Sequence, residues 1–345
     1  MKGVIIAAQN APWQAVDDIE KPVPGKHQLL VKSLVTGINP MDNLMRTTGL
    51  LIPSYPIVLG CDASGIVVET GPEVTKFRVG DGVFGCTRVG AAGYGTFQEF
   101  HLMDEKLTFK RPENISVEEA ATIGVGLLTA AICLDEGNDI MYPAERQNQP
   151  EWFIVLGGTS AVGQYGIKLA KLCGYQVLAS CSQSSIEIVK SAGADATFDY
   201  KQSTETQLSE IESITSGDFV GVFDASAAST AVGLAALKNK STVKTQKKTF
   251  STTNDWDTID EQKDISIYRV HLGQIGKYGE PAGDAVNRIV EKLIPRLESL
   301  LWKGLLEPNE GEIVATGFGG VSFGVDLSAK NGIGGKKILV KLQEV

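Results

Sequence analysis

The chain has 345 residues and a mass of 36.8 kDa, of which 43% are hydrophobic, and this size predicts two domains rather than one. Its net charge of -9 and pI near 5.0 argue against a nucleic-acid partner, which needs clustered Lys and Arg. No apolar run reaches the roughly 18 residues of a membrane span. The five cysteines are scattered and free of CxxC pairs, which is typical of reduced thiols. We therefore expect a cytoplasmic globular protein without a membrane or nucleic-acid partner.

The first 125 residues predict an irregular β-barrel domain. Met1–Ala8 lacks the features of a signal peptide and favours a first strand. Short β-rich runs such as Leu29–Val35 and Gly65–Glu69 follow, separated by Gly and Pro. The polar stretch Glu136–Glu151 predicts a surface loop before the next domain.

From Trp152 onward, buried strands alternate with helical segments. The expected elements are the strand Phe153–Leu156, a helix through Ala170, the strand Gln176–Ala179, the helix Ile186–Ser191 and the strand Val220–Asp224. Strands separated by helices of this length indicate βαβ units, so we predict an α/β fold with a doubly wound parallel sheet.

The remainder of the chain is less regular. Residues 241–264 are polar with mixed charge and predict an exposed excursion between strands, to which we assign no chemistry. A helix is expected over Asp284–Trp302, and the strand Ile338–Leu342 follows near the end of the sequence.

A phosphate-binding turn is predicted directly after the strand Phe153–Leu156. Glycines and small residues open the following helix, with the spacing Gly158-x-Ser160-x-x-Gly163, which departs from GxGxxG by one Ser. Unpaired N–H groups at a helix N-terminus bind pyrophosphate, and small residues allow close backbone approach. The predicted cradle residues are Gly158, Thr159, Ser160, Ala161, Val162 and Gly163. The alternative is a tight turn in some other α/β protein.

The end of the second strand bears on the choice of cofactor. An NAD-preferring site usually places an acid there against the ribose hydroxyls. Ala179–Ser182 contains no acid, and the next residues offer hydroxyl and amide donors. NADPH is therefore favoured over NADH, because Ser182, Gln183, Ser184 and Ser185 tolerate a 2′-phosphate without repelling it. A polar surface turn would look similar.

Several motifs in order along the chain resemble those of the medium-chain dehydrogenase/reductase family. They are Gly60–Val67, Val79–Gly85, the phosphate-binding turn and Ala192–Tyr200. The resemblance implies a GroES-like catalytic domain over residues 1–125, a Rossmann NADPH-binding domain over 126–275, and a return to the catalytic domain over 276–345.

The metal-binding residues of the zinc members are replaced. Asn39 and Cys61 stand where those members carry Cys and His ligands, and no four-cysteine lobe lies between Gly82 and Phe97. We therefore predict no metal.

The segment Ile38–Asp42 is similar to the INPxD motif shared by quinone reductases and fungal enoyl reductases. Ser180–Ser182 and Val189–Asp195 look closer to the fungal group, which acts in trans on polyketide intermediates. The resemblance implies hydride transfer from NADPH to the activated C=C of an enoyl thioester or enone, with a polyketide synthase as partner. Two alternatives stay open: an NADPH quinone reductase, and a catalytically inactive nucleotide-binding partner protein.

The same resemblance implies roles for single residues. Asp42 and Leu44 would border the nicotinamide, Tyr200 the adenine, and Ile333 and Gly334 the cofactor again. The substrate cleft would be lined by Gly124, Val125, Gly126, Leu127, Leu128, Thr129, Gly273, Gln274, Ile275 and Gly276. The alternative for each is packing at a domain junction.

No catalytic residue is singled out by the sequence. Asp42 and Thr129 are candidates, and we expect Asp42 to orient rather than to act as an acid, because an ordinary Asp is ionised at neutral pH. Solvent could also supply the proton. Other side chains chemically able to donate it are Tyr55, Tyr94, Tyr278 and His271.

Overall fold

The computed structural model describes residues 1–141, 151–239, 247–330 and 332–344. The chain forms two compact units. Unit 1 comprises Met1–Val125 and Leu272–Val345, and unit 2 comprises Gly126–His271. No helix of the described residues is long and apolar enough to cross a membrane.

Unit 2 contains a six-stranded sheet in which every pairing is parallel. Its strands are β9(Trp152–Leu156), β10(Gln176–Cys181), β11(Ala196–Asp199), β12(Phe219–Asp224), β13(Lys248–Thr252) and β14(Ile265–Arg269). Their spatial order is β11-β10-β9-β12-β13-β14. Counted from β9, this is 3-2-1-4-5-6, the order of doubly wound dinucleotide-binding sheets. The α/β class predicted from the sequence is confirmed.

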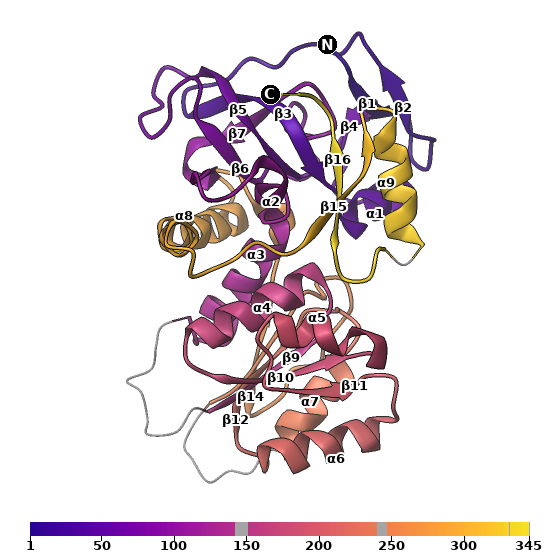
Figure 1. Ribbon diagram of the computed structural model, residues 1–345, viewed down its shortest axis with the longest axis vertical. Coiled ribbons are helices and arrows are strands. Elements are labelled where there is room, and N and C mark those ends of the chain that lie inside the picture. Colours follow the sequence, from indigo (N-terminus) through magenta and orange to yellow (C-terminus); the bar gives the residue numbers. More distant parts are fainter. Residues whose placement is uncertain (142–150, 240–246, 331, 345) are drawn as a thin grey trace. The chain divides into compact units, whose positions relative to one another are not determined.

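Helices connect these strands and pack against them (Figure 1). They are α4(Ala161–Leu172), α5(Ile186–Ser191), α6(Thr204–Thr215) and α7(Thr230–Asn239). Helix α4 packs on β9 and β10, whereas α6 packs on α7 and α7 on β12 and β13. The β9 sequence WFIVL is buried over four of its five residues, as expected for a strand that is covered on both faces.

Two expectations for unit 2 are wrong. Strand β13 lies within the stretch 241–264, which we expected to be an exposed excursion, and its Phe250 is fully buried. The polar residues around Phe250 concealed a strand that is only five residues long. Of the expected surface loop Glu136–Glu151, Asn138 is buried because its side chain bonds to Val222 and Thr249. Residues 142–150 and 240–246 lie outside the described residues.

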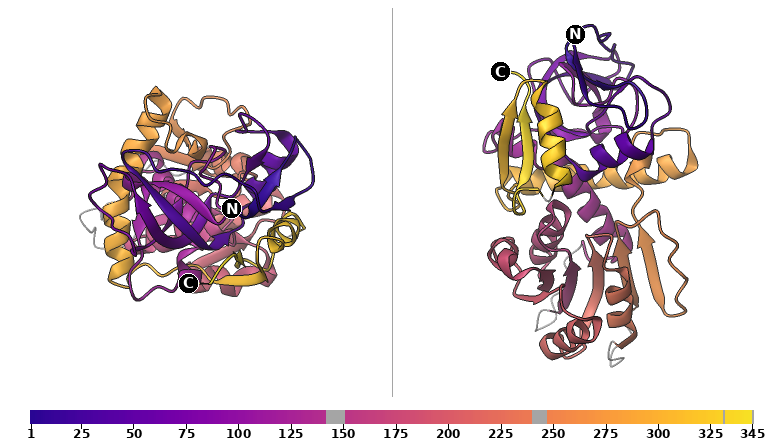
Figure 2. Two further views of the ribbon diagram at one scale, coloured as in Figure 1. Left: turned by 90° about the horizontal axis from the view of Figure 1, so that it is seen from above. Right: turned by 90° about the vertical axis from the view of Figure 1, so that its right-hand side faces the viewer.

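Unit 1 is built on a seven-stranded sheet that joins distant parts of the chain. Its strands are β3(Gln28–Gly37), β5(Asp62–Thr70), β6(Gly82–Cys86), β7(Phe100–Asp104), β8(Phe109–Lys110), β15(Gly311–Thr316) and β16(Lys337–Lys341). Strand β16 pairs antiparallel with β3 and parallel with β15. The yellow strands β15 and β16 lie beside the yellow helix α9(Gly320–Ala329) in Figure 2.

Smaller elements complete unit 1. A three-stranded sheet contains β1(Gly3–Ile6), β2(Gln14–Val16) and β4(Ile57–Val58). The helices are α1(Pro40–Thr48), α2(Val117–Ala120), α8(Pro281–Trp302) and α9, and α3(Gly124–Ile132) begins in this unit.

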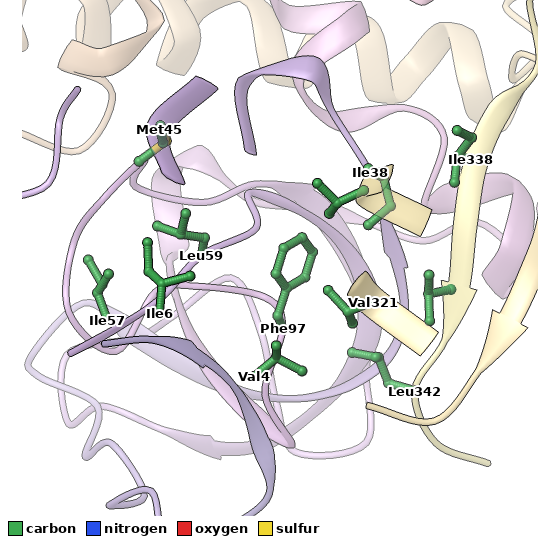
Figure 3. Close-up of a cluster of buried hydrophobic side chains, with 12 residues drawn as sticks. Val4, Ile6, Ile38, Met45, Ile57, Leu59, Phe97, Val321, Ile338 and Leu342 are labelled. Carbon is green, nitrogen blue, oxygen red and sulfur yellow. The ribbon is translucent and has the colours of Figure 1, made fainter. Parts of the chain in front are cut away.

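A buried apolar cluster fixes the strands that carry the candidate site. Ile38 and Ile338 both belong to it, together with Phe97 and Val321 (Figure 3). The Ile38 N–H also donates to the Ile338 carbonyl over 2.9 Å. Asn39 and Lys337, the sequence neighbours of these two isoleucines, are thereby held on adjoining backbone.

Candidate functional site

The turn after β9 has the geometry of a phosphate cradle. Gly157 has φ +76°, a left-handed conformation that L side chains rarely adopt. Its N–H donates to the Ser180 hydroxyl over 2.8 Å, and the Gly158 N–H donates to the Ser180 carbonyl over 2.9 Å. Strand β10 thus fixes the turn at the carboxyl end of β9, where the strand order reverses and where dinucleotides bind in such sheets.

Gly163 and Ser160 have different structural roles in this cradle. A Cβ on Gly163 would lie 2.2 Å from the Gly157 carbonyl oxygen, so only glycine lets the helix approach the turn so closely. Ser160 is the N-cap of α4, and its hydroxyl accepts from the Gly163 N–H over 2.9 Å. The serine that interrupts the glycine pattern therefore caps the helix. Of the other predicted cradle residues, Thr159, Ala161 and Val162 are half-buried and Gly158 is buried.

A cluster of hydroxyls lies at the carboxyl end of β10. The Ser182 hydroxyl is 3.1 Å from that of Ser184 and 2.9 Å from that of Ser185. Gln183 is exposed and lines a cavity of about 270 Å³, which also borders the end of β11. Tyr200 follows β11 and is 50% exposed, but it does not line this cavity.

Asp224 at the end of β12 was missed in the sequence. It is fully buried, and its carboxylate accepts from the N–H and hydroxyl of Ser226 and from the Ser229 N–H. Ser226 lies against Gly157, because a Cβ on Gly157 would be 2.7 Å from the Ser226 Cβ. The sequence feature that could have indicated Asp224 is its place at the end of a predicted strand, directly before the small residues Ala225–Ser229.

In unit 1, one ammonium group joins two polar side chains in a buried cluster. The Lys337 Nζ donates to the Asn39 Oδ1 over 2.5 Å and to the Asp62 Oδ2 over 2.8 Å. Asn39 in turn donates through Nδ2 to the same Asp62 oxygen over 2.9 Å. The other oxygen of Asp62 accepts the Val125 N–H over 2.7 Å. The side chains of Lys337 and Asp62 are 5% and 0% exposed.

Asp42 lies in the first turn of α1, near this cluster. Its carboxylate accepts the Asn39 N–H over 2.7 Å, and the residue is 1% exposed. Burial raises the pKa of Asp42 to about 7, although the Asn39 hydrogen bond and Lys337 oppose the shift. The sequence did not indicate this burial, which removes the carboxyl group of Asp42 from water.

Two thiols adjoin Asp62. Cys61, Asp62 and Cys86 offer ligand atoms that all lie within 4.8 Å of one another, and all three residues are buried. Cross-strand pairing of Asp62 with Cys86 brings β6 into the group, which sequence spacing did not indicate. The neighbouring Cys86 and burial raise the pKa of the Cys61 thiol well above its usual value.

The predicted substrate residues lie mainly in the interior. Leu127 and Leu128 are fully buried on α3, and Val125 is half-buried. Gly124 packs on the cluster, because a Cβ there would be 2.0 Å from the Asp62 Oδ1, and Gly126 is also buried.

The second predicted substrate segment is in unit 1. A Cβ on Gly273 would be 2.7 Å from Leu51, and one on Gly276 would be 2.3 Å from Arg88. Gln274 is half-buried and Ile275 buried. Of the residues predicted to meet the cofactor from unit 1, Leu44 and Ile333 are half-buried and Gly334 is exposed.

The candidate proton donors differ in their partners. The buried hydroxyls of Thr129 and Tyr55 have no hydrogen-bond partner among the described residues. The Tyr94 hydroxyl already donates to Asp104 and accepts from Gln28, and burial raises its pKa. Burial also raises the pKa of Tyr278. His271 is exposed and its Nδ1 lies 3.4 Å from Asp255.

Family models match one segment in each unit. Residues 25–113 match the alcohol dehydrogenase GroES-like domain, and residues 161–244 match the zinc-binding dehydrogenase model. The second match begins inside the cradle at Ala161 and includes the strands β10, β11 and β12. The chain belongs to the medium-chain dehydrogenase/reductase superfamily.

Among curated members of this superfamily, the relatives include fungal proteins. Dehydrogenase pigH from Monascus ruber is 34% identical over 212 residues, covering 58% of this chain and 58% of pigH. Trans-enoyl reductase TOXD from Cochliobolus carbonum is 37% identical over 182 residues, 51% of this chain and 60% of TOXD. The chain thus spans little more than half the length of these relatives. Trans-enoyl reductase RAP1 from Pyricularia oryzae is 27% identical over 340 residues, 93% of this chain and 92% of RAP1.

Solved structures of the superfamily share the fold. An alcohol dehydrogenase superfamily protein from Novosphingobium aromaticivorans has a TM-score of 0.82 at 22% identity, covering 99% of this chain and 100% of that one. A mycobacterial protein complexed with NADPH has a TM-score of 0.75 at 21% identity, covering 99% of each chain. At these identities the likeness concerns the fold alone.

Zinc, which the second family model implies, does not fit the residues near Asp62. A zinc site needs deprotonated, unoccupied ligands in a tetrahedral arrangement. Here both oxygens of Asp62 already accept hydrogen bonds, one of them from the Lys337 ammonium, and the pKa of Cys61 is raised. The nucleotide fits better, since the cradle around Gly157 and Gly163 leaves the small, close-approach backbone that a pyrophosphate needs.

Proposed function

We propose that this chain is a zinc-independent, NADPH-dependent oxidoreductase that transfers hydride to the activated C=C of an enoyl thioester or enone, in trans on a polyketide intermediate. The cradle between β9 and α4, at the point where the strand order reverses, carries the proposal. The names of the trans-enoyl reductases TOXD and RAP1 support an enoyl group as the substrate and action in trans.

The preference for NADPH is supported by the end of β10. Ser182, Ser184 and Ser185 place three hydroxyls within hydrogen-bonding distance in a cluster that contains no carboxylate. Hydroxyl groups can donate to a 2′-phosphate, whereas an acid would repel it. The NADPH-bound mycobacterial neighbour is consistent with this choice.

Different groups of residues would have different roles in the reaction. Bound NADPH would supply the hydride. The cradle from Gly158 to Gly163 would hold the pyrophosphate, and Ser182 to Ser185 the 2′-phosphate. Asp42, with its raised pKa, would lie at the nicotinamide side and could hold a proton near neutral pH.

Proton delivery to the α-carbon of the substrate completes the reduction. Negative charge develops on the carbonyl oxygen when hydride adds at the β-carbon, so a hydrogen-bond donor placed there lowers the barrier. The Thr129 and Tyr55 hydroxyls have no hydrogen-bond partner among the described residues, so either can donate a hydrogen bond or a proton. Water is the remaining source of the proton.

The test is oxidation of NADPH by the purified protein, with a crotonyl-type enoyl thioester and a small quinone as parallel substrates and EDTA present throughout. We expect turnover of the thioester that survives chelation. Turnover of quinone alone would instead favour a quinone reductase. Tight NADPH binding without turnover of either substrate would favour a nucleotide-binding protein without catalytic activity.

A further inference from the structure

The Lys337 ammonium pairs with the carboxylate that a metal ion would need as a ligand in this cluster. The ammonium is 2.8 Å from the Asp62 Oδ2, and Asp62 is the carboxylate that completes the three-ligand group with Cys61 and Cys86. An ammonium and a divalent cation cannot share one buried carboxylate oxygen without strong repulsion, because water screens little in the interior. The lysine side chain is 5% exposed, so the charge is not displaced toward solvent.

The ammonium also fixes two backbone segments through its partners. Asn39 is the N-cap of α1, yet its side-chain oxygen accepts from Lys337 and its amide donates to Asp62. Asp62 reaches the first turn of α3 through the Val125 N–H. One positive charge on β16 thus connects the start of α1, which carries Asp42, with the start of α3.

The apolar surroundings keep this arrangement in place. Ile38 and Ile338, the sequence neighbours of Asn39 and Lys337, are both buried in the same hydrophobic core (Figure 3). The backbone at Lys337 therefore cannot shift without disturbing the backbone hydrogen bond between these two isoleucines.

We propose that the Lys337 ammonium is the resident cation of this cluster, where it neutralises Asp62, positions Asn39 and keeps a metal ion out. Lys337 is a positioning residue in this scheme. Only its effect on turnover rests on the proposed function; its effects on metal binding and stability do not.

The first test compares the affinity for Co²⁺, followed by the thiolate-to-cobalt absorption band, in the full-length wild type and in Lys337→Met. The variant should bind Co²⁺ at least about tenfold more tightly, because removal of the charge leaves Asp62 available to a cation. Lys337→Arg keeps the charge and should behave as the wild type does. Cys86→Ser in the Lys337→Met background should abolish the gain and thereby locate the metal. Equal affinity in the wild type and Lys337→Met would overturn the proposal.

The second test remains decisive if Lys337→Met folds poorly. The double variant Asp62→Asn/Lys337→Met removes both charges, while the oxygen of the introduced amide can still accept the Val125 N–H. Its melting temperature should recover most of what Lys337→Met loses. A double variant as unstable as Lys337→Met would contradict the assignment of Lys337 as the counter-cation of Asp62.

Measurement of turnover distinguishes two roles of Lys337: the positioning of Asn39 and the neutralisation of Asp62. With Asn39 no longer held by the ammonium, the refolded double variant should have a kcat at least about tenfold below that of the wild type, with the KM for NADPH little changed. Wild-type kcat in a stable double variant would show that Lys337 only balances Asp62. If the wild type turns over neither substrate, the proposed function fails, whereas Co²⁺ affinity and melting temperature still decide the role of Lys337.

Discussion

At the scale of single residues, Asp42 shows how burial can outweigh local hydrogen bonding. Its carboxylate accepts the Asn39 N–H and lies within the field of Lys337, and both effects lower its pKa. Loss of water is the larger effect, so the pKa rises to about 7 from the usual value of 3.8. Asp42 is consequently a group whose charge changes near neutral pH.

This shift predicts the pH dependence of stability. Because the folded-state pKa is raised, the stabilisation by protonated Asp42 is complete below the unfolded pKa and is lost as pH rises through about 7. Relative to Asp42→Asn, which cannot ionise and still offers an acceptor to Asn39, the wild type should lose about 1.4 kcal/mol per pH unit in this window. Urea unfolding of both proteins at pH 5, 6, 7 and 8 measures the difference. If the free energies of unfolding of the two proteins changed with pH in parallel, the raised pKa of Asp42 would be contradicted.

At the scale of secondary-structure elements, the contact between β9 and α4 depends on Gly163. An added Cβ would lie 2.2 Å from the backbone oxygen of Gly157, which no side-chain rotation can relieve. Gly163→Ala should therefore weaken NADPH binding by about tenfold or more, since the helix N-terminus must move away from the turn. Fluorescence titration of NADPH measures the effect. Gly319→Ala is the control, because Gly319 has φ -60° and open space around its Cα.

The end of β10 makes a second prediction at this scale. Ser182→Asp replaces one of the three clustered serine hydroxyls by a carboxylate. It should reduce the ratio of NADPH to NADH affinity by at least about tenfold, because the acid repels a 2′-phosphate and accepts from ribose hydroxyls. Ser184→Ala removes a hydroxyl without adding charge and should have a smaller effect. An unchanged ratio in Ser182→Asp would place the 2′-phosphate elsewhere.

The elements also show what sequence reasoning can and cannot find. The cradle and the serine cluster were predicted because their signals are local, within a few residues of one strand end. Strand β13 was missed because a single fully buried aromatic residue, Phe250, lies among polar neighbours. The cluster of Asn39, Asp62 and Lys337 was missed because Lys337 is 298 and 275 residues from its partners. Such contacts are set by sheet pairing, which no short pattern encodes.

At the scale of the whole molecule, the two units have separate hydrophobic cores. The proposed phosphate contacts all lie in unit 2, so NADPH should stabilise the chain through that unit. At a concentration about 100 times its Kd, NADPH should add about 2.7 kcal/mol to the free energy of unfolding. Differential scanning calorimetry should show a higher melting temperature with NADPH than with NADH at the same concentration. The same increase with both nucleotides would contradict the preference for NADPH.

The pairing of β3 with β16 has a consequence for the order of folding. Unit 2 is one continuous segment, whereas unit 1 must bring together strands that flank this segment in the sequence. Closing a longer loop costs more entropy, by about 0.6 kcal/mol for each doubling of its length, and distant pairings form slowly. The six-stranded sheet of unit 2 can therefore form while the seven-stranded sheet is still open. The ion pair between Asp62 and Lys337 spans the same long loop, so it cannot form before β16 has reached the sheet.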